Sequence, residues 1–421
     1  MPASVRLSHA ADVISALRPG MTVFVPGMSG ESLAFYEALR AEPQRAERLT
    51  FVGVHFPGIN RPGYLGLHPT VRFRAYFMSP AIRAGISEGR VDLMPLDYSA
   101  IVRDLEQNMH IDVAIAQVSP PDAKGRCSLG VTQDFLPSIW QNARIRVAHV
   151  NPRLPRTSGS FQLRIEDCQL AFECDAEIPS VRSETADAAT LEHARLAADL
   201  IEDGATLQFG VGRLQTAMLM SLVNHRNLRV YSGMISPAIL HLLENGAIRR
   251  DFPVECGVAL GDAEFYAKLN GDSRFHFRPA RETHDIRRIA AIPNFCAVNS
   301  ALEVDLLGQV NADSVNGRLV AGVGGLPAFS CGARLSPGGR SIIILPATAE
   351  GGRTSRIVCK LSGSAFAALP RSEADYVVTE HGVARLRGLS LHDRAAMLIS
   401  IAAPKFRAGL EEAWHEVARQ L

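Results

Sequence analysis

The sequence predicts an α/β fold made of two open α/β domains, and three observations support this. The chain of 421 residues is too long for one ordinary hydrophobic core. At about 150 residues per domain, this length predicts two to three domains. Hydrophobic residues make up 47% and aromatic residues only 6%, which favours α/β layers over an all-β sandwich. Short apolar runs alternate with amphipathic helical patterns, as in parallel sheets covered on both faces.

The N-terminal part shows this alternation from its start. Residues 8–20 predict an amphipathic helix closed by Pro19 and Gly20, followed by a buried strand that ends at Gly27. A second helix is expected at residues 31–42. Further strands are expected at residues 49–56, 91–98, 111–118 and 145–151.

A polar, proline-containing stretch at residues 176–188 precedes a strong helical pattern at 190–204 and predicts the domain boundary. We therefore expect domains at residues 1–182 and 183–421. After the boundary the same alternation restarts, with helices expected from about Leu214, at 237–247 and in the tail, where Pro404 interrupts the pattern. Strands are expected at residues 206–210, 228–233, 254–260, 295–300, 339–345 and 374–379.

Charge and cysteine usage exclude several classes of function. Lys plus Arg (44) nearly balance Asp plus Glu (43), so no global field attracts nucleic acid or an anionic membrane. No apolar run reaches the 18 or so residues of a membrane span, and no targeting segment is recognised. The seven cysteines form no C-x-x-C pair, which indicates reduced thiols in a cytoplasmic protein.

Glycine-rich segments are the strongest local signals. Gly210-Val211-Gly212-Arg213 follows a predicted strand and opens a helix, so its backbone N–H groups could face an anion, although such a turn also needs glycine for steric reasons. Residues 321–329 contain Gly322, Gly324 and Gly325, and predict either a ligand-contacting loop or a plain one. Residues 119–125 form a turn after a strand, where open sheets place ligands.

Two common kinds of site are not indicated. The 13 histidines show no metal-ligand spacing, so no metal site is expected. A G-x-S-x-G elbow is also missing, which argues against an α/β-hydrolase triad.

An ordered series of segments resembles the acetyl-CoA hydrolase/transferase family, in its 4-hydroxybutyrate CoA-transferase-like branch. The series spans nearly the whole chain and reads SPPDAKGRCSLGVTQDF, EDGATLQFGVGR, NSALEVDLLGQVNADS, AGVGG, IIILPATAEGGRTSRIV and ADYVVTEHGVARLRGLSLHDRAAMLISIAAPKF.

The resemblance implies two open α/β domains of the CoA-transferase type with an acyl-CoA cleft between them. It also implies coenzyme A or an acyl-CoA as substrate, bound with help from the two Gly-rich loops. A family glutamate attacks the thioester and passes through a glutamyl-CoA intermediate, so the default chemistry needs a carboxylate nucleophile. Under the same resemblance, the protein could assemble as a homodimer or as a hetero-oligomer with a catalytic homologue.

The family carries that glutamate in a segment of the form [H/T]-[S/T]-E-M-I-S-D-G. An ungapped comparison with Tyr231-Ser232-Gly233-Met234-Ile235-Ser236-Pro237-Ala238 places Gly233 at the glutamate. Other expected polar residues also differ: Leu326 and Pro327 replace polar side chains of a G-G-Q-x-D-F pattern, and Glu350 replaces a lysine expected near the CoA phosphates. Arg353 could offset that charge reversal in part.

Three hypotheses follow from these departures. The first is an enzyme that transfers an acyl group from a thioester to water or another acceptor without glutamyl-CoA. The second is a non-catalytic CoA-binding homologue or an inactive partner subunit. The third is an ordinary CoA-transferase with a relocated carboxylate, for which Asp262 and Glu264 are the nearest candidates in sequence. Both could equally be solvated carboxylates at the start of a helix. Cys331 is a weaker candidate nucleophile, and a core role suits it better.

Overall fold

The computed structural model describes residues 7–60, 63–182, 186–361 and 365–420. The chain forms two compact units. One contains the described residues up to Arg182, with Pro253–Thr283 and Val320–Gly322, and is called the first unit. The other contains the later residues up to Phe252, His284–Leu319 and the chain from Val323 onward, and is called the second unit. The domain boundary expected between residues 182 and 183 stays a prediction.

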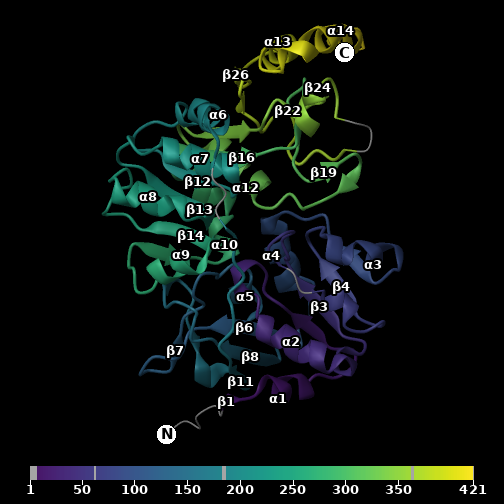
Figure 1. The fold of residues 1–421 in the computed structure, drawn as a ribbon, viewed down its shortest axis with the longest axis vertical. Coiled ribbons are helices and arrows are strands. Elements are labelled where there is room, and N and C mark those ends of the chain that lie inside the picture. The colour runs from purple at the N-terminus through teal and green to yellow at the C-terminus, as the bar shows by residue number, and fades with distance from the viewer. Residues whose placement is uncertain (1–6, 61–62, 183–185, 362–364, 421) are drawn as a thin grey trace. The chain divides into compact units, whose positions relative to one another are not determined.

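The first unit is built on a parallel eight-stranded sheet (Figure 1). Its strands, in spatial order, are β1 (Leu7–Ser8), β11 (Leu170–Glu173), β8 (Ile145–Val150), β6 (Val113–Val118), β2 (Thr22–Phe24), β3 (Thr50–Gly53), β4 (Arg72–Ala75) and β5 (Val91–Leu93). Every residue of β6 is buried, as expected for a strand covered on both faces. The unit also contains β14 (Val254–Ala259), β15 (Phe275–Phe277) and β9 (Ser158–Gly159), which pair in parallel.

The helices of the first unit start where the sequence supplies side-chain caps. Ser32 caps α2 (Leu33–Ala41) by accepting a hydrogen bond from the backbone N–H of Phe35 at 3.2 Å. Asp97 caps α4 (Tyr98–Gln107) in the same way through Ala100 at 2.8 Å. The remaining α-helices are α1 (Ala10–Ser15), α3 (Arg83–Ser87), α5 (Leu136–Ile139), α9 (Ala263–Lys268) and α10 (Ala280–Thr283).

The second unit contains a sheet whose strands are parallel except for β26, which is antiparallel to its neighbour. In spatial order they are β26 (Gly382–Arg385), β25 (Tyr376–Thr379), β21 (Arg340–Ile344), β16 (Phe295–Ser300), β12 (Thr206–Phe209) and β13 (Arg229–Ile235). The α-helices are α6 (Ala188–Ala198), α7 (Arg213–Ser221), α8 (Ala238–Glu244), α11 (Ile286–Ala290), α12 (Leu326–Leu335), α13 (Leu391–Ser400) and α14 (Pro404–Ala418).

The α/β class with parallel sheets is therefore confirmed, and most differences from the predicted elements are at their ends. The first predicted helix is shorter, at Ala10–Ser15, and the interruption near Pro404 is confirmed because this proline is the first residue of α14. Strand β4 was not expected. Its sequence RFRA alternates arginine with apolar residues, and Arg74 can lie in the sheet because Asp104 pairs with it at 2.8 Å.

Candidate functional site

Each unit has a point where the order of its strands reverses. In the second unit the chain passes from β12 to β13 on one side, and later strands extend the sheet from β12 on the other side through β16. The connections after β12 and β16 therefore leave in opposite directions at the carboxyl end of the sheet. Open α/β sheets bind ligands at such points, so residues that follow β12 and β16 are the first candidates for a site.

The loop after β12 is the first Gly-rich segment. Gly212 has a φ of +116°, and no heavy atom lies within 4 Å of a β-carbon built on it, so the backbone can be approached closely. Gly210 is similarly open, with the Cγ of Gln215 at 3.9 Å as its nearest neighbour. Val211 is exposed, and Arg213 begins α7 with its guanidinium 3.7 Å from Asp187.

Buried and half-buried amide groups connect the strand ends next to this loop. Gln208 and Asn299 exchange two hydrogen bonds, of 3.2 and 3.0 Å, between β12 and β16. Gln215, on the first turns of α7, donates from Nε2 to Ser300 Oγ at 3.2 Å. Its Oε1 atom is buried and has no hydrogen-bond partner among the described residues. The amides therefore hold the Gly-rich loop on a rigid support.

Gly233 lies within β13, two residues before the strand ends at Ile235. Ser232, beside it, is fully buried and donates to the carbonyl of Met234 at 2.7 Å. A β-carbon built on Gly233 would lie 3.1 Å from both Cε1 and Nε2 of His284, and 3.3 Å from Cε2 of Phe329. The edge of an imidazole ring therefore packs directly against the Gly233 backbone.

The second Gly-rich segment contacts the same imidazole. A β-carbon on Gly325 would come within 2.5 Å of His284 Nε2 and 2.8 Å of Phe329 Cε2, so only glycine fits there without movement of the ring. His284 is 3% exposed, and its ring centroid lies 4.7 Å from that of Phe329 at an interplanar angle of 54°. The second unit thus brings Gly233 and Gly325 together around His284.

The other residues of this segment have separate surroundings. Gly324 has a φ of +61°, a conformation that favours glycine. Gly322 belongs to the first unit, where a β-carbon on it would lie 2.8 Å from the carbonyl oxygen of Tyr76. Arg353 is exposed after a short turn, and Glu350 in that turn accepts a hydrogen bond from Thr354 at 3.1 Å. Ligand binding by these residues stays a prediction.

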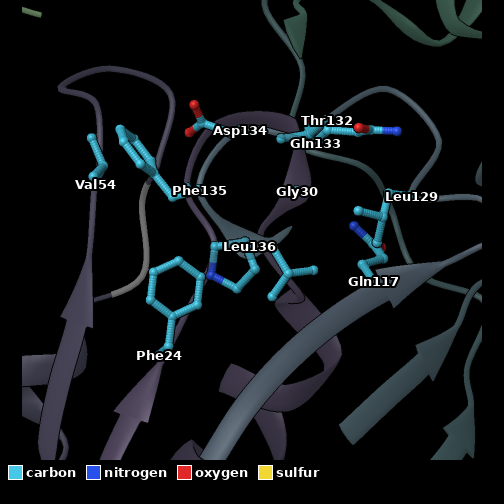
Figure 2. Close-up of a pocket in the computed structure, with 12 residues that line it drawn as sticks. Phe24, Gly30, Val54, Gln117, Leu129, Thr132, Gln133, Asp134, Phe135 and Leu136 are labelled. Atoms are coloured by element: carbon cyan, nitrogen blue, oxygen red, sulfur yellow. The ribbon is translucent and has the colours of Figure 1, made fainter. Parts of the chain in front are cut away.

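Figure 2 shows a pocket of the first unit. It lies at this unit's own strand reversal, where β2 is between β3 and β6. Its cavity volume of about 10 Å³ is close to what one water molecule needs. The lining combines apolar and polar side chains with backbone of two glycines. It consists of Phe24, Pro26, Gly27, Gly30, Val54, Gln117, Leu129, Thr132, Gln133, Asp134, Phe135 and Leu136.

Among the described residues of that lining, Asp134 alone carries a carboxyl group. Burial raises the pKa of this group to about 8, so the carboxyl is largely protonated at neutral pH and can donate a hydrogen bond. Its backbone has a φ of +35°, which is uncommon for a residue with a side chain. Gln117 is held in place nearby, because it donates to the carbonyl of Glu31 at 3.2 Å and accepts from Asn151 at 2.7 Å.

Gly27→Ala is expected to destabilise the protein by at least about 2 kcal/mol. A β-carbon on Gly27 would lie 1.8 Å from the backbone oxygen of Val54, so two loop backbones would have to separate. Chemical denaturation measures the effect. Gly66→Ala is the matched control, because no heavy atom lies within 4 Å of its β position, and equal stability losses in the two variants would contradict the prediction.

A second buried carboxyl group, Glu31, lies beside the same loops of the first unit. Asn60 donates from Nδ2 to Glu31 Oε2 at 2.8 Å, and its Oδ1 accepts from the backbone N–H groups of Met28 and Phe56. Glu31 Oε1 and His55 Nε2 lie 3.9 Å apart, and both are without hydrogen-bond partners among the described residues. Burial raises the pKa of Glu31 to about 8 and lowers that of His55 to about 4, so both groups are largely neutral near pH 7.

The two carboxylates proposed as relocated nucleophiles have ordinary helical roles. Asp262 caps α9 by accepting a hydrogen bond from the backbone N–H of Phe265 at 2.9 Å. Glu264 is exposed and lies 3.0 Å from the ammonium of Lys268 one turn later. Nothing in these contacts prepares either group for nucleophilic attack.

All seven cysteines are free. Cys331 is half-buried in α12, so the core role stays the simpler interpretation. Burial raises the pKa values of three other thiols, to about 11 for Cys127 and Cys296 and about 12 for Cys168. Burial raises the pKa of Cys256 further.

Sequence analysis did not identify His284, Glu31 or Asp134 as candidate residues. His284 stands in the segment RETHD, which has no recognisable motif or spacing, and its contacts come from residues distant in sequence. Asp134 and its neighbour Gln133 lie in GVTQDF, part of the segment series that carried the family resemblance, so that series was the one available signal.

Two further features concern the part of the chain that the structure describes. Within it, no group of three or more His, Cys, Asp or Glu side chains is arranged to hold a metal ion. Within the same ranges, none of the helices combines the length and the apolar character that crossing a membrane requires.

Comparisons with known proteins agree with the fold. Residues 4–178 match the acetyl-CoA hydrolase/transferase N-terminal domain, and residues 261–414 match the C-terminal domain. The chain is 35% identical to 4-hydroxybutyrate coenzyme A transferase of Clostridium kluyveri over 368 residues, 85% of each chain. It is 30% identical to succinyl-CoA:cyclohexane-1-carboxylate CoA transferase of Geobacter metallireducens, covering 98% of this chain and 96% of that protein.

Among solved structures, RipA from Yersinia pestis superimposes with a TM-score of 0.91 and 28% identity, and the match covers 98% of both chains. Matches to both family domains, together with relatives at 30% identity or more over most of their length, establish that this chain belongs to the acetyl-CoA hydrolase/transferase family.

Proposed function

We propose that this protein binds an acyl-CoA or a related thioester and transfers the acyl group to water or another acceptor without a glutamyl-CoA intermediate. The observation that carries the proposal is the surroundings of Gly233. This residue has no side chain to act as a nucleophile, and the space at its β position is bounded by His284 at 3.1 Å and Phe329 at 3.3 Å. A carboxylate mechanism at residue 233 therefore has neither the group nor free room for it.

Two features support thioester binding. The Gly210–Gly212 loop lies at the strand reversal of the second unit and leaves its backbone open to a ligand. It precedes α7, a nine-residue helix, whose first N–H groups favour an anionic group such as a phosphate. Backbone N–H groups at such a loop can also stabilise the oxygen of a thioester when negative charge develops on it.

Covalent trapping tests the proposal. The purified protein is incubated with acetyl-CoA or butyryl-CoA, treated with borohydride or hydroxylamine, and analysed by mass spectrometry, while released CoA is measured in parallel. We expect release of CoA with no modified carboxylate. A modified Asp262 or Glu264 would instead favour a relocated carboxylate. Binding of the acyl-CoA with no release of CoA would favour a non-catalytic CoA-binding homologue.

A further inference from the structure

His284 lies between Gly233 of β13 and Gly325 of the second Gly-rich segment. Its Cε1–Nε2 edge lies against Gly233, and Nε2 also faces Gly325. Both glycines are partly exposed, whereas the imidazole between them is 3% exposed. A basic nitrogen is thus covered by backbone that carries no side chains, near the carboxyl end of β13, and open α/β sheets bind ligands at the carboxyl ends of their strands.

The two glycines are needed to make room for the ring. A β-carbon on Gly325 would overlap Nε2 at 2.5 Å, and one on Gly233 would be unusually close at 3.1 Å. The ring is bordered by glycines from two separate segments, one in β13 and one directly before α12. The local backbone is therefore matched to an imidazole at this position.

Packing also fixes the orientation of the ring. Phe329 contacts His284 with a centroid separation of 4.7 Å, and Phe329 is itself stacked on Phe295 at 6.4 Å and 10°. These aromatic residues belong to a buried cluster with Tyr231, which immediately precedes Ser232 and Gly233. An imidazole held in one orientation is suited to directed proton transfer, because a catalytic base must be aligned with the proton it removes.

We infer that His284 is the general base of a thioester hydrolase site, an inference that rests on the proposed function. Neutral imidazole removes a proton from a water molecule while the water oxygen forms a bond to the thioester carbonyl carbon. The tetrahedral intermediate then collapses, the C–S bond breaks, and the CoA sulfur takes the proton from the imidazolium. The products are the free acid and CoA, and His284 returns to its neutral form.

Water is the acceptor that this arrangement favours. The imidazole is covered by Gly233 and Gly325, so a molecule that reaches Nε2 must be small. A carboxylic acid acceptor would need a larger opening, and at neutral pH it would have no proton for a base to remove. The site therefore points to hydrolysis of an acyl thioester and away from exchange of CoA between two acids.

His284→Gln tests the inference on the full-length protein. This variant keeps a polar side chain and removes the base, and we expect kcat for CoA release from acetyl-CoA or butyryl-CoA to fall by about 10²–10⁴-fold with little change in KM. His241→Gln is the matched control, because His241 lies on α8, is half-buried, and its ring pairs with Asn245 of the same helix. The control is expected to keep the wild-type kcat.

Chemical rescue separates a catalytic base from a structural ring. His284→Ala leaves a space bounded by Gly233, Gly325 and Phe329, and added imidazole is expected to restore part of kcat. Pyrazole has the same size and is a much weaker base, so it should restore little. Equal rescue by the two compounds would show that the ring only fills space, and would overturn the inference.

The outcomes also separate this inference from the proposed function. CoA release without a trapped carboxylate, combined with a wild-type kcat in His284→Gln, would leave the proposed function in place and overturn the role of His284. A trapped carboxylate in the wild-type protein, or no CoA release at all, would overturn both. Loss of kcat in His284→Gln with selective rescue by imidazole would support both.

Discussion

Gly233→Glu combined with His284→Ala is expected to accumulate a glutamyl-CoA adduct, whereas Gly233→Glu alone is expected to accumulate at least about tenfold less. In the single variant the new β-carbon would be 3.1 Å from the imidazole, so the glutamate would be pushed from the position in which it could attack. Removal of the ring provides that space. The adduct is measured by mass spectrometry after incubation with acetyl-CoA and reduction with borohydride.

Gly233→Gln with His284→Ala is the matched control. The glutamine side chain is as large as that of glutamate but has no carboxylate nucleophile, so this variant should form no adduct. Equal adduct in the single and double glutamate variants would show that His284 does not obstruct residue 233. If neither glutamate variant forms an adduct while both still bind acetyl-CoA, the other substitutions, such as Leu326 and Pro327, must have changed the site as well.

Glu31→Gln is expected to remove a large part of the pH dependence of stability. Burial raises the pKa of Glu31 to about 8 in the folded protein, from an ordinary value of 4.5. Between these pH values the folded chain keeps a proton that the unfolded chain has lost, so raising the pH favours unfolding. The difference corresponds to roughly 4 kcal/mol of folding free energy lost from pH 4.5 to 8. The variant lacks this loss, so its free energy of unfolding should increase relative to that of the wild type as pH rises.

Urea denaturation at pH 5, 7 and 9 measures this difference between variant and wild type. The variant and the wild type are compared at each pH because other buried groups also make stability depend on pH in both proteins. Burial raises the pKa of Asp134 to about 8 and lowers those of His55 and His149 to about 4. Glu37→Gln is the control, since Glu37 is exposed and pairs with Arg40 on the helix surface. A variant-to-wild-type difference that stays constant from pH 5 to 9 would refute the assignment of a buried, protonated Glu31.

The sequence predicted the layers of the fold because its signals are local. Buried strands such as VAIAQV at β6 are apolar at every residue but Gln117, and caps such as Ser390 at α13 lie next to the helices they begin. Helix ends were less predictable: residue 31 was assigned to a helix, whereas Ser32 is the cap of α2 and Glu31 is buried before it. Local pattern does not reveal that a charged residue will be buried by a loop from elsewhere in the chain.

The candidate site was predicted only in part for the same reason. Glycines at 210, 212 and 325 were visible as turns, but what each glycine accommodates depends on residues far away in sequence. His284 is separated from Gly233 by 51 positions and contacts it through the tertiary fold. The family register suggested that a carboxylate is missing at residue 233, and the structure adds the imidazole that packs against the vacant β position.

The buried thiols have a practical consequence for every experiment on CoA release. A thiol reagent reacts with the thiolate, and the raised pKa values of Cys127, Cys168, Cys256 and Cys296 keep these groups protonated near pH 7. Of the three half-buried cysteines, burial also raises the pKa of Cys359, so Cys174 and Cys331 are the thiols left to react most readily in the folded protein. Free CoA can therefore be followed continuously with a colorimetric disulfide reagent after the protein's own accessible thiols have reacted.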